Sequence, residues 1–383
     1  MNLELSAEQS AVKALARDFT DREITPHAAA WDRAESVDRG IVKKLGALGF
    51  LGLTIEERYG GCGGDHLAYC LVTEELGRGD SSVRGIVSVS LGLVATSIAR
   101  WGSEEQKQEW LPRLTSGQAL GCFGLTEPGT GSDAARLTTR AERDGDTYVI
   151  TGSKMFITNG TWADVVLLFA RTGGEPGHRG ISAFLVPADA PGLTRREIHG
   201  KLGLRGQATA ELALDAVRVP AAAMLGPEGK GFSVAMAALA KGRMSVAAGS
   251  VGIAQACLEA AVAYAGQREQ FGAPIAGRQL VQELLADIAV DVDAARLLTW
   301  RVADHIDRGL PFATESSTAK LYAAEAAVRC ANNALQVFGG YGYIDEYPAG
   351  KLLRDARVMT LYEGTSQIHK LLIGRALTGV SAF

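Results

Sequence analysis

The 383-residue sequence lacks the features that mark several protein classes. Its 39 basic and 43 acidic residues give a net charge of -4, without the basic excess of a nucleic-acid-binding protein. The five cysteines are scattered without a CxxC pair, and the six histidines show no HExxH spacing. We therefore expect no nucleic-acid partner, no bound metal and no disulfide framework, and we expect the cysteines to be buried thiols.

Long hydrophobic runs are also missing from the chain. No stretch approaches the ~18 uninterrupted apolar residues of a membrane-spanning helix, and the N-terminus has no basic segment followed by an apolar run. We expect a cytoplasmic protein without membrane insertion. What the chain does have is 47% hydrophobic residues, which is enough for a large core shared by two or three domains.

Hydrophobic periodicity divides the chain into three parts. Residues 1–120 are predicted to be helical, and Ser6 with Gln9 forms a capping-box pattern at the first helix. Residues 121–229 contain short apolar runs separated by turn residues, which predicts a β domain. Residues 230–383 return to long helical periods. The order predicts an α+β multidomain protein with a helical domain, a β domain and a helical bundle.

The segment Phe123–Asp133, FGLTEPGTGSD, is the most informative motif. Closely spaced Gly129 and Gly131 let successive backbone N–H groups converge on an anion, so the loop can cradle a pyrophosphate. Thr126 and Ser132 add hydroxyl donors. The motif is not the dinucleotide fingerprint, because the third glycine and the βαβ unit are missing. A tight turn between two strands is the alternative interpretation.

The segment 362–368, YEGTSQI, contains a candidate general base, Glu363. Burial beside an aromatic residue can raise the pKa of a carboxyl group toward neutrality, as a base that works near pH 7 requires. The alternative is an acidic residue in the first turn of a helix, where it would complement the helix dipole.

Two other motifs carry weaker signals. The segment 154–160, KMFITNG, offers an aromatic face and a hydroxyl for a planar ring, although a phenylalanine in a strand is commonly part of a core. The segment 268–272, REQFG, offers an arginine for a phosphate, although an arginine at a helix end can simply complement the dipole.

Taken together and in this order, the motifs resemble those of the acyl-CoA dehydrogenase family over nearly the whole chain, most closely its short-chain, butyryl-type branch. The resemblance implies an N-terminal α-helical domain, a central β-barrel domain and a C-terminal four-helix bundle. It also implies a homotetramer with FAD bound between subunits. The matching segments are GLTEPGTGSD (124–133), KMFITNG (154–160), REQFG (268–272), QVFGGYGY (336–343) with Arg354 and Asp355, and YEGTSQI (362–368).

The resemblance also implies roles for individual residues. Thr126 and Thr158 would hydrogen-bond the flavin ring, and Phe156 would pack against it. Residues of the C-terminal domain would hold the adenine half of a neighbouring subunit's FAD. The implied substrate contacts are Ser132, Arg243, Tyr362 and Gly364. The implied cofactor contacts are Phe123, Leu125, Thr126, Gly131, Ser132, Phe156, Thr158, Arg268, Gln270, Phe271, Gln279, Gln336, Gly339, Gly340, Thr365 and Gln367.

The implied reaction converts an acyl-CoA to a trans-2-enoyl-CoA in fatty-acid β-oxidation. Glu363 would take the α-proton while a hydride leaves Cβ for flavin N5, and the electrons would pass to an electron-transfer flavoprotein. The thioester carbonyl must be polarised by fixed donors, because its α-proton is only weakly acidic. Some family members carry the base on a helix immediately before an arginine, but here Gly242 precedes Arg243, which leaves Glu363 as the expected base.

Two departures from the family pattern leave open whether the acyl group is carried by CoA or by an acyl carrier protein. Arg136 stands where a small residue normally follows the GSDAA run. Ala240 replaces an acidic residue that contacts the pantetheine arm, and losing one such hydrogen bond costs about 0.5–1.5 kcal/mol. An acyl-carrier-protein thioester is therefore an alternative to acyl-CoA, and neutral drift is another explanation. The alternative functions are an acyl-CoA oxidase, which usually has a longer chain, and a non-catalytic relative.

Overall fold

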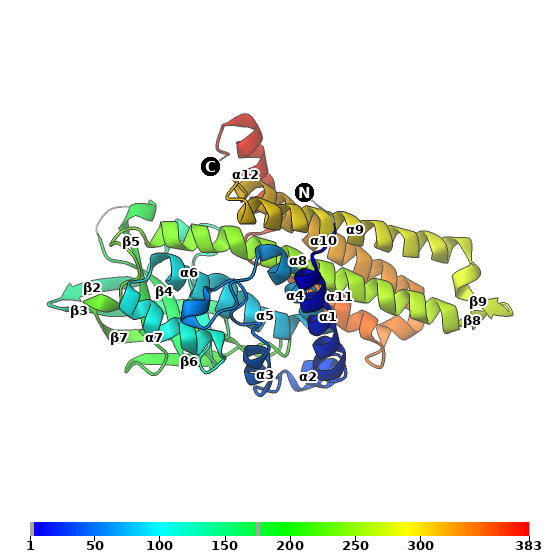
Figure 1. The fold of residues 1–383 in the computed structure, drawn as a ribbon, viewed down its shortest axis with the longest axis horizontal. Coiled ribbons are helices and arrows are strands. Elements are labelled where there is room, and N and C mark those ends of the chain that lie inside the picture. The colour runs from blue at the N-terminus through cyan, green and yellow to red at the C-terminus, as the bar shows by residue number, and fades with distance from the viewer. Residues whose placement is uncertain (1–3, 174–176, 383) are drawn as a thin grey trace.

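The computed structural model describes residues 4–173 and 177–382. A β-rich part lies at one end of the molecule, long C-terminal helices extend to the other end, and the N-terminal helices lie across the middle (Figure 1). The predicted architecture of helical, β and helical domains is confirmed. We propose domain limits of 1–120, 121–229 and 230–383, because helices give way to strands between Thr115 and Gly121 and return at Gly231.

The N-terminal helices begin where the sequence predicts. The Gln9 N–H donates to Ser6 Oγ at 3.1 Å and the Ser6 N–H donates to Gln9 Oε1 at 2.9 Å, so the capping box is formed. The elements are α1 (Ala7–Phe19), η1 (Thr20–Ile24), α2 (Ala28–Ala34), α3 (Ile41–Ala47), η2 (Glu57–Tyr59), α4 (His66–Gly79), α5 (Ser81–Val89), η3 (Ser90–Ala95), α6 (Thr96–Trp101) and α7 (Glu104–Thr115).

The described part of the middle domain is one seven-stranded sheet in the order β1-β4-β2-β3-β7-β6, with β5 paired to β4. A register shift between Lys154 and Ile157 interrupts the pairing of β3 with β7. Phe156 lies in this interruption with φ of 59°. The strands and short helices are β1 (Gly121–Gly124), η4 (Ala134–Arg136), β2 (Arg140–Asp144), β3 (Thr147–Thr158), β4 (Val165–Arg171), η5 (Gly177–Gly180), β5 (Ile181–Pro187), β6 (Leu193–Glu197), β7 (Thr209–Pro220) and η6 (Ala221–Ala223).

Helix α8 is the longest element and crosses most of the molecule (Figure 1). It lies close to α4, because a Cβ on Gly77 would be only 2.8 Å from the carbonyl oxygen of Gly249. Helix α12 projects from the body. The elements are α8 (Gly231–Gln267), β8 (Glu269–Gln270), β9 (Ala273–Pro274), η7 (Ile275–Gly277), α9 (Gln279–Asp307), α10 (Ala313–Phe338), η8 (Gly339–Tyr343), α11 (Pro348–Met359) and α12 (Ser366–Thr378).

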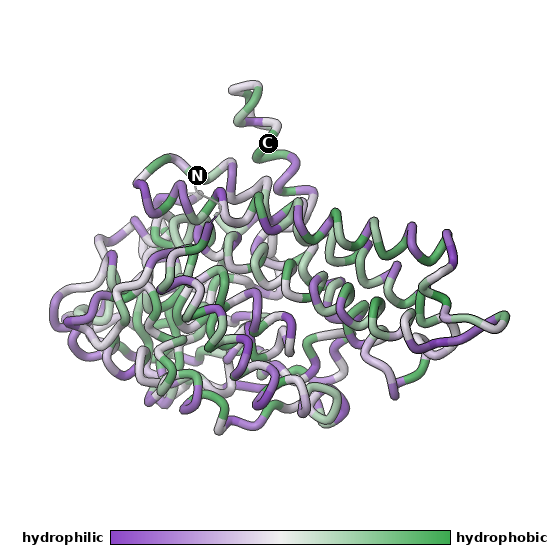
Figure 2. Tube along the Cα trace, turned by 45° about the vertical axis from the view of Figure 1, so that its right-hand side comes forward, coloured by the Kyte–Doolittle hydropathy of each residue, from purple (hydrophilic) through white to green (hydrophobic). Residues whose placement is uncertain are grey.

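Hydrophobic residues gather in the packed interior and also recur along the C-terminal helices (Figure 2). Two helical stretches, Ser81–Trp101 and Gly231–Gln267, are long and apolar enough to cross a membrane, but 89% and 61% of their most apolar windows are buried. The helices in the core of a folded protein can be equally long and apolar. The expectation of buried thiols is correct for four cysteines and wrong for Cys62, which is exposed, and all five are unpaired.

Candidate active site

Glu363 lies in the short connection between α11 and α12, with φ of 51°. It precedes Thr365, the N-cap of α12, so it lies outside the first turn of that helix. Its carboxylate rests on α8, where a Cβ on Gly242 would be 2.2 Å from Oε2. Oε2 is buried and has no hydrogen-bond partner among the described residues. The carboxylate can therefore lie here only because position 242 has no side chain.

Burial raises the pKa of Glu363 to about 7, even though the positive charges of Arg84, Lys320 and Arg243 favour its ionised form. Removing a carboxylate from water penalises the charged state, and here that penalty exceeds the attraction of three cations. A carboxyl group with this pKa is poised to accept a proton near neutral pH.

Two other buried groups hold the connection in place. Lys320 is fully buried and its Nζ donates to the carbonyl oxygen of Gly364 at 2.7 Å. Burial lowers the pKa of Lys320 to about 7. The ring of His369 packs against Gly364, and burial lowers the pKa of His369 to about 3, so this histidine is neutral. These contacts fix the backbone that carries Glu363.

Arg243 follows Gly242 on α8 and donates weakly to Ser317 Oγ at 3.5 Å. Its Nε is buried without a partner among the described residues, and burial lowers the pKa of its guanidinium. The structure thus brings Arg243 to the same region as Glu363, as the predicted substrate contact requires.

A polar cluster that the sequence did not reveal lies beside Tyr362. Arg84 of α5 is 1% exposed and donates to the hydroxyl of Tyr362 and to Ser88 Oγ, the latter at 3.1 Å. The hydroxyls of Ser88 and Ser245 are 2.6 Å apart, and the Tyr69 hydroxyl donates to Ser245 at 2.9 Å. Arg84 is the single charged residue between 81 and 99, which is the signal that could have drawn attention to it.

The loop 124–133 is anchored by a buried ion pair. Lys154 Nζ lies 2.9 Å from Glu127 Oε1, and Glu127 also accepts the backbone N–H groups of Thr138 at 2.7 Å and Thr139 at 2.9 Å. Burial alone would raise the pKa of Glu127, but Lys154 and these hydrogen bonds hold it at about 2. Glu127 is thus anchored, and the residues that follow it in the loop are exposed except for the half-buried Thr130.

The residues predicted to bind the pyrophosphate lie in this mostly exposed part of the loop. A Cβ on Gly129 or on Gly131 would meet no atom within 4 Å, and Ser132 is exposed. Thr130 Oγ1 is buried without a partner among the described residues. An open glycine loop with an unpaired hydroxyl fits a phosphate-bearing cofactor.

The predicted flavin-ring residues lie beside this loop. The N–H of Met155 donates to the carbonyl oxygen of Thr126 at 2.9 Å, which ties the loop to β3. Thr158 at the end of β3 donates to Gln207 Oε1 at 3.3 Å. Phe156 is 67% exposed, so its ring does not belong to the core. An exposed aromatic ring beside two threonine hydroxyls fits one side of a flavin.

Phe123, which directly precedes this loop, connects it to the Glu363 region through apolar contacts. Phe123 packs on a small cluster that includes Leu93 and Ala238. A Cβ on Gly242 would be 2.8 Å from Leu93 Cδ2. Leu125 is buried, and its carbonyl oxygen accepts from Lys154 Nζ at 3.3 Å. We call the region formed by Glu363, Gly242, Leu93 and Phe123 the base chamber.

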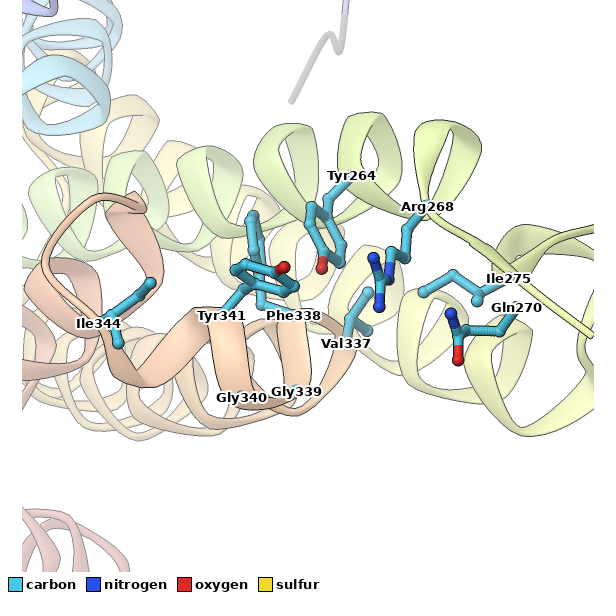
Figure 3. A pocket seen from close by; sticks show the side chains of 10 residues that line it. All are labelled: Tyr264, Arg268, Gln270, Ile275, Val337, Phe338, Gly339, Gly340, Tyr341 and Ile344. Atoms are coloured by element: carbon cyan, nitrogen blue, oxygen red, sulfur yellow. The ribbon is translucent and has the colours of Figure 1, made fainter.

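The predicted adenine contacts lie at the opposite end of α8. The guanidinium of Arg268 lies over the ring of Tyr341, 5.3 Å from its centroid, and points into an open cleft of about 500 Å³ (Figure 3). Phe271, between β8 and β9, is 95% exposed. Gln279 at the start of α9 and Gln336 near the end of α10 are also exposed. We call this open cleft the adenine cleft, after the predicted contacts, and it is lined by Tyr264, Arg268, Gln270, Ile275, Val337, Phe338, Gly339, Gly340, Tyr341 and Ile344.

Two predicted cofactor residues lie at the start of α12. Thr365 caps this helix by accepting the N–H of Ile368 at 3.2 Å. Gln367 lines a second cleft of about 280 Å³, together with Ser366 and Arg357. The candidate site residues therefore lie in separate groups around Glu363, around Arg268 and at the start of α12.

The base chamber and the adenine cleft are far apart within one chain. Gly242 and Arg268 are separated by roughly 40 Å of helix, at 1.5 Å per residue. One FAD molecule cannot reach both. The structure thus brings Glu363 to Gly242 toward one end of α8 and Arg268 to Gly340 at the other. Thr126 accepts a hydrogen bond from Met155 of β3, and Thr158 at the end of β3 donates to Gln207.

Comparison with known proteins identifies the family. Residues 6–118, 122–217 and 229–378 match the models of the acyl-CoA dehydrogenase N-terminal, middle and C-terminal domains. The chain belongs to the acyl-CoA dehydrogenase family, a class of FAD-dependent oxidoreductases, and FAD is its cofactor. The chain is an acyl-CoA dehydrogenase, and its predicted resemblance to the short-chain branch is confirmed.

Named relatives cover nearly the whole chain. The probable acyl-CoA dehydrogenase YngJ of Bacillus subtilis is 46% identical and aligns with 98% of this chain and 100% of its own length. The short-chain-specific acyl-CoA dehydrogenase of Clostridium acetobutylicum is 40% identical, with 97% of this chain and 98% of its own length aligned.

Solved structures show the same fold. Butyryl-CoA dehydrogenase from Megasphaera elsdenii has a TM-score of 0.96 at 41% identity, covering 98% of this chain and 100% of its own. A glutaryl-CoA dehydrogenase from Mycobacterium smegmatis in complex with FADH2 has a TM-score of 0.95 at 40% identity, covering 99% and 96%. The prolyl acyl carrier protein oxidase AnaB has a TM-score of 0.94 at 30% identity, covering 98% and 100%.

Proposed function

We propose that this enzyme removes two hydrogens from the α and β carbons of an acyl thioester, with Glu363 as the base. The observation that carries this proposal is a carboxylate whose Oε2 is buried and unpaired and whose pKa is about 7. Such a group can hold the α-proton at Oε2 after taking it from the substrate. Bound FAD supplies the acceptor for the other hydrogen and its electron pair.

The other residues of the chain would bind, orient and exclude water. Thr126 and Thr158 would donate to the flavin ring, and Phe156 would cover it. Leu93 and Phe123 would keep water from the base chamber, which strengthens every hydrogen bond inside it. The Glu363 backbone N–H would donate to the thioester oxygen and so make the α-proton more acidic.

We further propose that each FAD is shared between two copies of the chain, and that the enzyme is a homotetramer. Support comes from the roughly 40 Å of helix between Gly242 and Arg268, because the two halves of the cofactor site in one chain cannot serve one FAD. Exposed apolar residues on the C-terminal helices also favour assembly. They include Leu280 at 76%, Val290 at 67% and Leu377 at 81% exposure.

An electron-transfer flavoprotein is the proposed acceptor of the electrons, and β-oxidation in the cytoplasm is the proposed setting. The carrier of the acyl group is proposed to be CoA, with an acyl-carrier-protein thioester as the second candidate. The second candidate is supported by the likeness to AnaB, which is named for an acyl carrier protein. Arg136, which departs from the family pattern, is exposed just after the loop 124–133. An oxidase would be recognised by peroxide release during aerobic turnover.

The test is an anaerobic titration of the FAD-bound protein with butyryl-CoA and with butyryl-acyl-carrier protein, followed by flavin absorbance. Flavin bleaching by either thioester supports dehydrogenation, and Glu363→Gln should slow it by about 10²–10⁴-fold while FAD stays bound. Unimpaired bleaching in Glu363→Gln would refute the assignment of the base.

A further inference from the structure

Arg84 is the most buried arginine in the described part of the chain and has no carboxylate partner, a lack that it shares with the less buried Arg243 and Arg301. Arg78 is paired with Glu75 at 2.7 Å and Asp21 at 2.6 Å, and Arg296 is paired with Glu74 at 2.8 Å. Arg84 is 1% exposed and forms no ion pair with any described residue. Its Nε is also buried without a hydrogen-bond partner among those residues. A buried cation normally requires an anion, because removing a charge from water costs several kcal/mol.

The surrounding helices make room for this guanidinium. A Cβ on Gly249 of α8 would be 2.8 Å from Arg84 Nε and 2.9 Å from its Cδ, so only glycine fits there. Glycine in a helix interior costs about 1 kcal/mol relative to alanine. Gly249 therefore leaves the space that the guanidinium occupies, at the point where α8 also packs closely on Gly77 of α4.

Glu363 is not the hydrogen-bonded counter-ion of Arg84. The two groups are close enough that, after burial, Arg84 has the largest influence on the pKa of Glu363. Nevertheless the Arg84 donors go to Ser88, Tyr362 and the sulfur of Met359, and Glu363 Oε2 accepts no hydrogen bond from the described residues. A guanidinium with a free donor therefore lies near the base, among hydroxyl groups.

We propose that Arg84 recognises a carboxylate at the far end of the acyl chain, so that the preferred substrates are monothioesters of dicarboxylic acids. This inference rests on the proposed function, since it places the acyl chain between Glu363 and Arg84. A chain that ends in a methyl group would bury the free N–H of Arg84 against carbon and leave it unpaired. A terminal carboxylate would satisfy it, and the hydroxyls of Ser88 and Tyr362 would complete its surroundings.

The first test compares matched thioesters on one carrier by anaerobic flavin reduction of the holoenzyme. The pairs are succinyl with butyryl, glutaryl with pentanoyl, and adipyl with hexanoyl. We expect kcat/KM to favour the carboxylated member by about 10-fold or more in at least one pair, the effect of a charge-assisted hydrogen bond in a buried site. Equal or better reduction by the neutral member in all three pairs would overturn the inference and leave the proposed dehydrogenation intact.

The second test measures the same ratio in Arg84→Met and in the control Arg78→Met, which removes a buried arginine outside the base chamber. The ratio for the favoured pair should fall about 10-fold or more in Arg84→Met and remain at the wild-type value in Arg78→Met. Because both substrates use the same base, a change in the pKa of Glu363 cancels in the ratio. A ratio that Arg84→Met leaves unchanged would overturn the role of Arg84. Failure of every thioester to bleach the flavin would instead count against the proposed function itself.

Discussion

The base chamber and the adenine cleft differ in how far their charged side chains are buried. In and around the chamber, Glu363, Lys320 and Arg84 are removed from water, and the pKa values of Glu363 and Lys320 move toward neutrality. In the cleft, the half-buried Arg268 lies over the ring of Tyr341 and faces an open space. The chamber is suited to moving a proton, because burial changes acidity. The cleft is suited to holding an anion, because the guanidinium of Arg268 lines it and can donate two parallel hydrogen bonds to a phosphate.

The largest expected effect concerns the buried ion pair of Glu127 and Lys154, which anchors the loop 124–133. Glu127→Gln should destabilise the fold by about 3–5 kcal/mol, because it leaves the charge of Lys154 buried without a partner. Urea unfolding of the apoprotein would measure this. Glu127→Gln with Lys154→Met should recover part of the loss, and Arg218→Ala, which breaks an exposed pair with Asp144, should change little. A loss below about 1 kcal/mol would contradict the prediction.

The same ion pair also makes the stability of the protein depend on pH in the acid range. The pKa of Glu127 is lowered from its usual 4.5 to about 2, so its stabilisation is present above pH 4.5 and disappears as pH falls through about 2. The Glu127→Gln variant should therefore lose less stability than the wild type over this range.

The next effect concerns the close approach of α8 to the base. Gly242→Ala would place a methyl group 2.2 Å from Oε2 of Glu363, so the carboxylate must move. A displacement of about 1 Å typically costs about 100-fold in rate, which stopped-flow flavin reduction would reveal. Gly266→Ala on the same helix meets no atom within 4 Å and is the matched control. Equal rates in the two variants would mean that the base does not rest on Gly242 during the reaction.

A smaller effect is expected at the cleft. Arg268→Ala should weaken FAD binding about 10-fold, since it removes the charge-assisted contact that we propose between this arginine and the cofactor. The measurement is FAD release during serial ultrafiltration, with Arg113→Ala of α7 as a surface control. Retention of FAD at the wild-type level would separate the cleft from the cofactor site.

The smallest effect is a shift in pH dependence. The charge of Lys320 lowers the pKa of Glu363, so Lys320→Met should raise that pKa. Because Glu363 must be ionised to accept a proton, the acid limb of flavin reduction near pH 7 should move upward by about one pH unit. Lys320→Arg keeps the charge and should keep the limb in place. A downward shift in Lys320→Met would contradict this account.

Local signals in the sequence predicted local structure well. Ser6 and Gln9 predicted a helix start because a capping box involves residues three positions apart. The three-domain order followed from the change in hydrophobic period. Arg84 was missed because it lies in an apolar helical run and its significance depends on Tyr362, which is 278 residues away in sequence. Lys320 was missed for the same reason, since its contact with Gly364 depends on the packing of α10 against the final connection.

The motif at residues 124–133 shows the limit of spacing as a signal. Its glycines predicted an anion cradle, but Glu127 received no role, because neither the motif nor its spacing shows that Lys154 lies beneath it. The position of Glu363 could be predicted from the family resemblance. Its fit against Gly242 required coordinates.

Helix α8 makes the geometry of two distant regions depend on one length. It carries Gly242 near one region and ends next to Arg268 in the other. Each added residue would advance the far end by about 1.5 Å and rotate it by about 100°. A single insertion between these points would therefore turn the arginine away from its cleft without touching the glycine, so the number of residues in this helix matters as well as their identity.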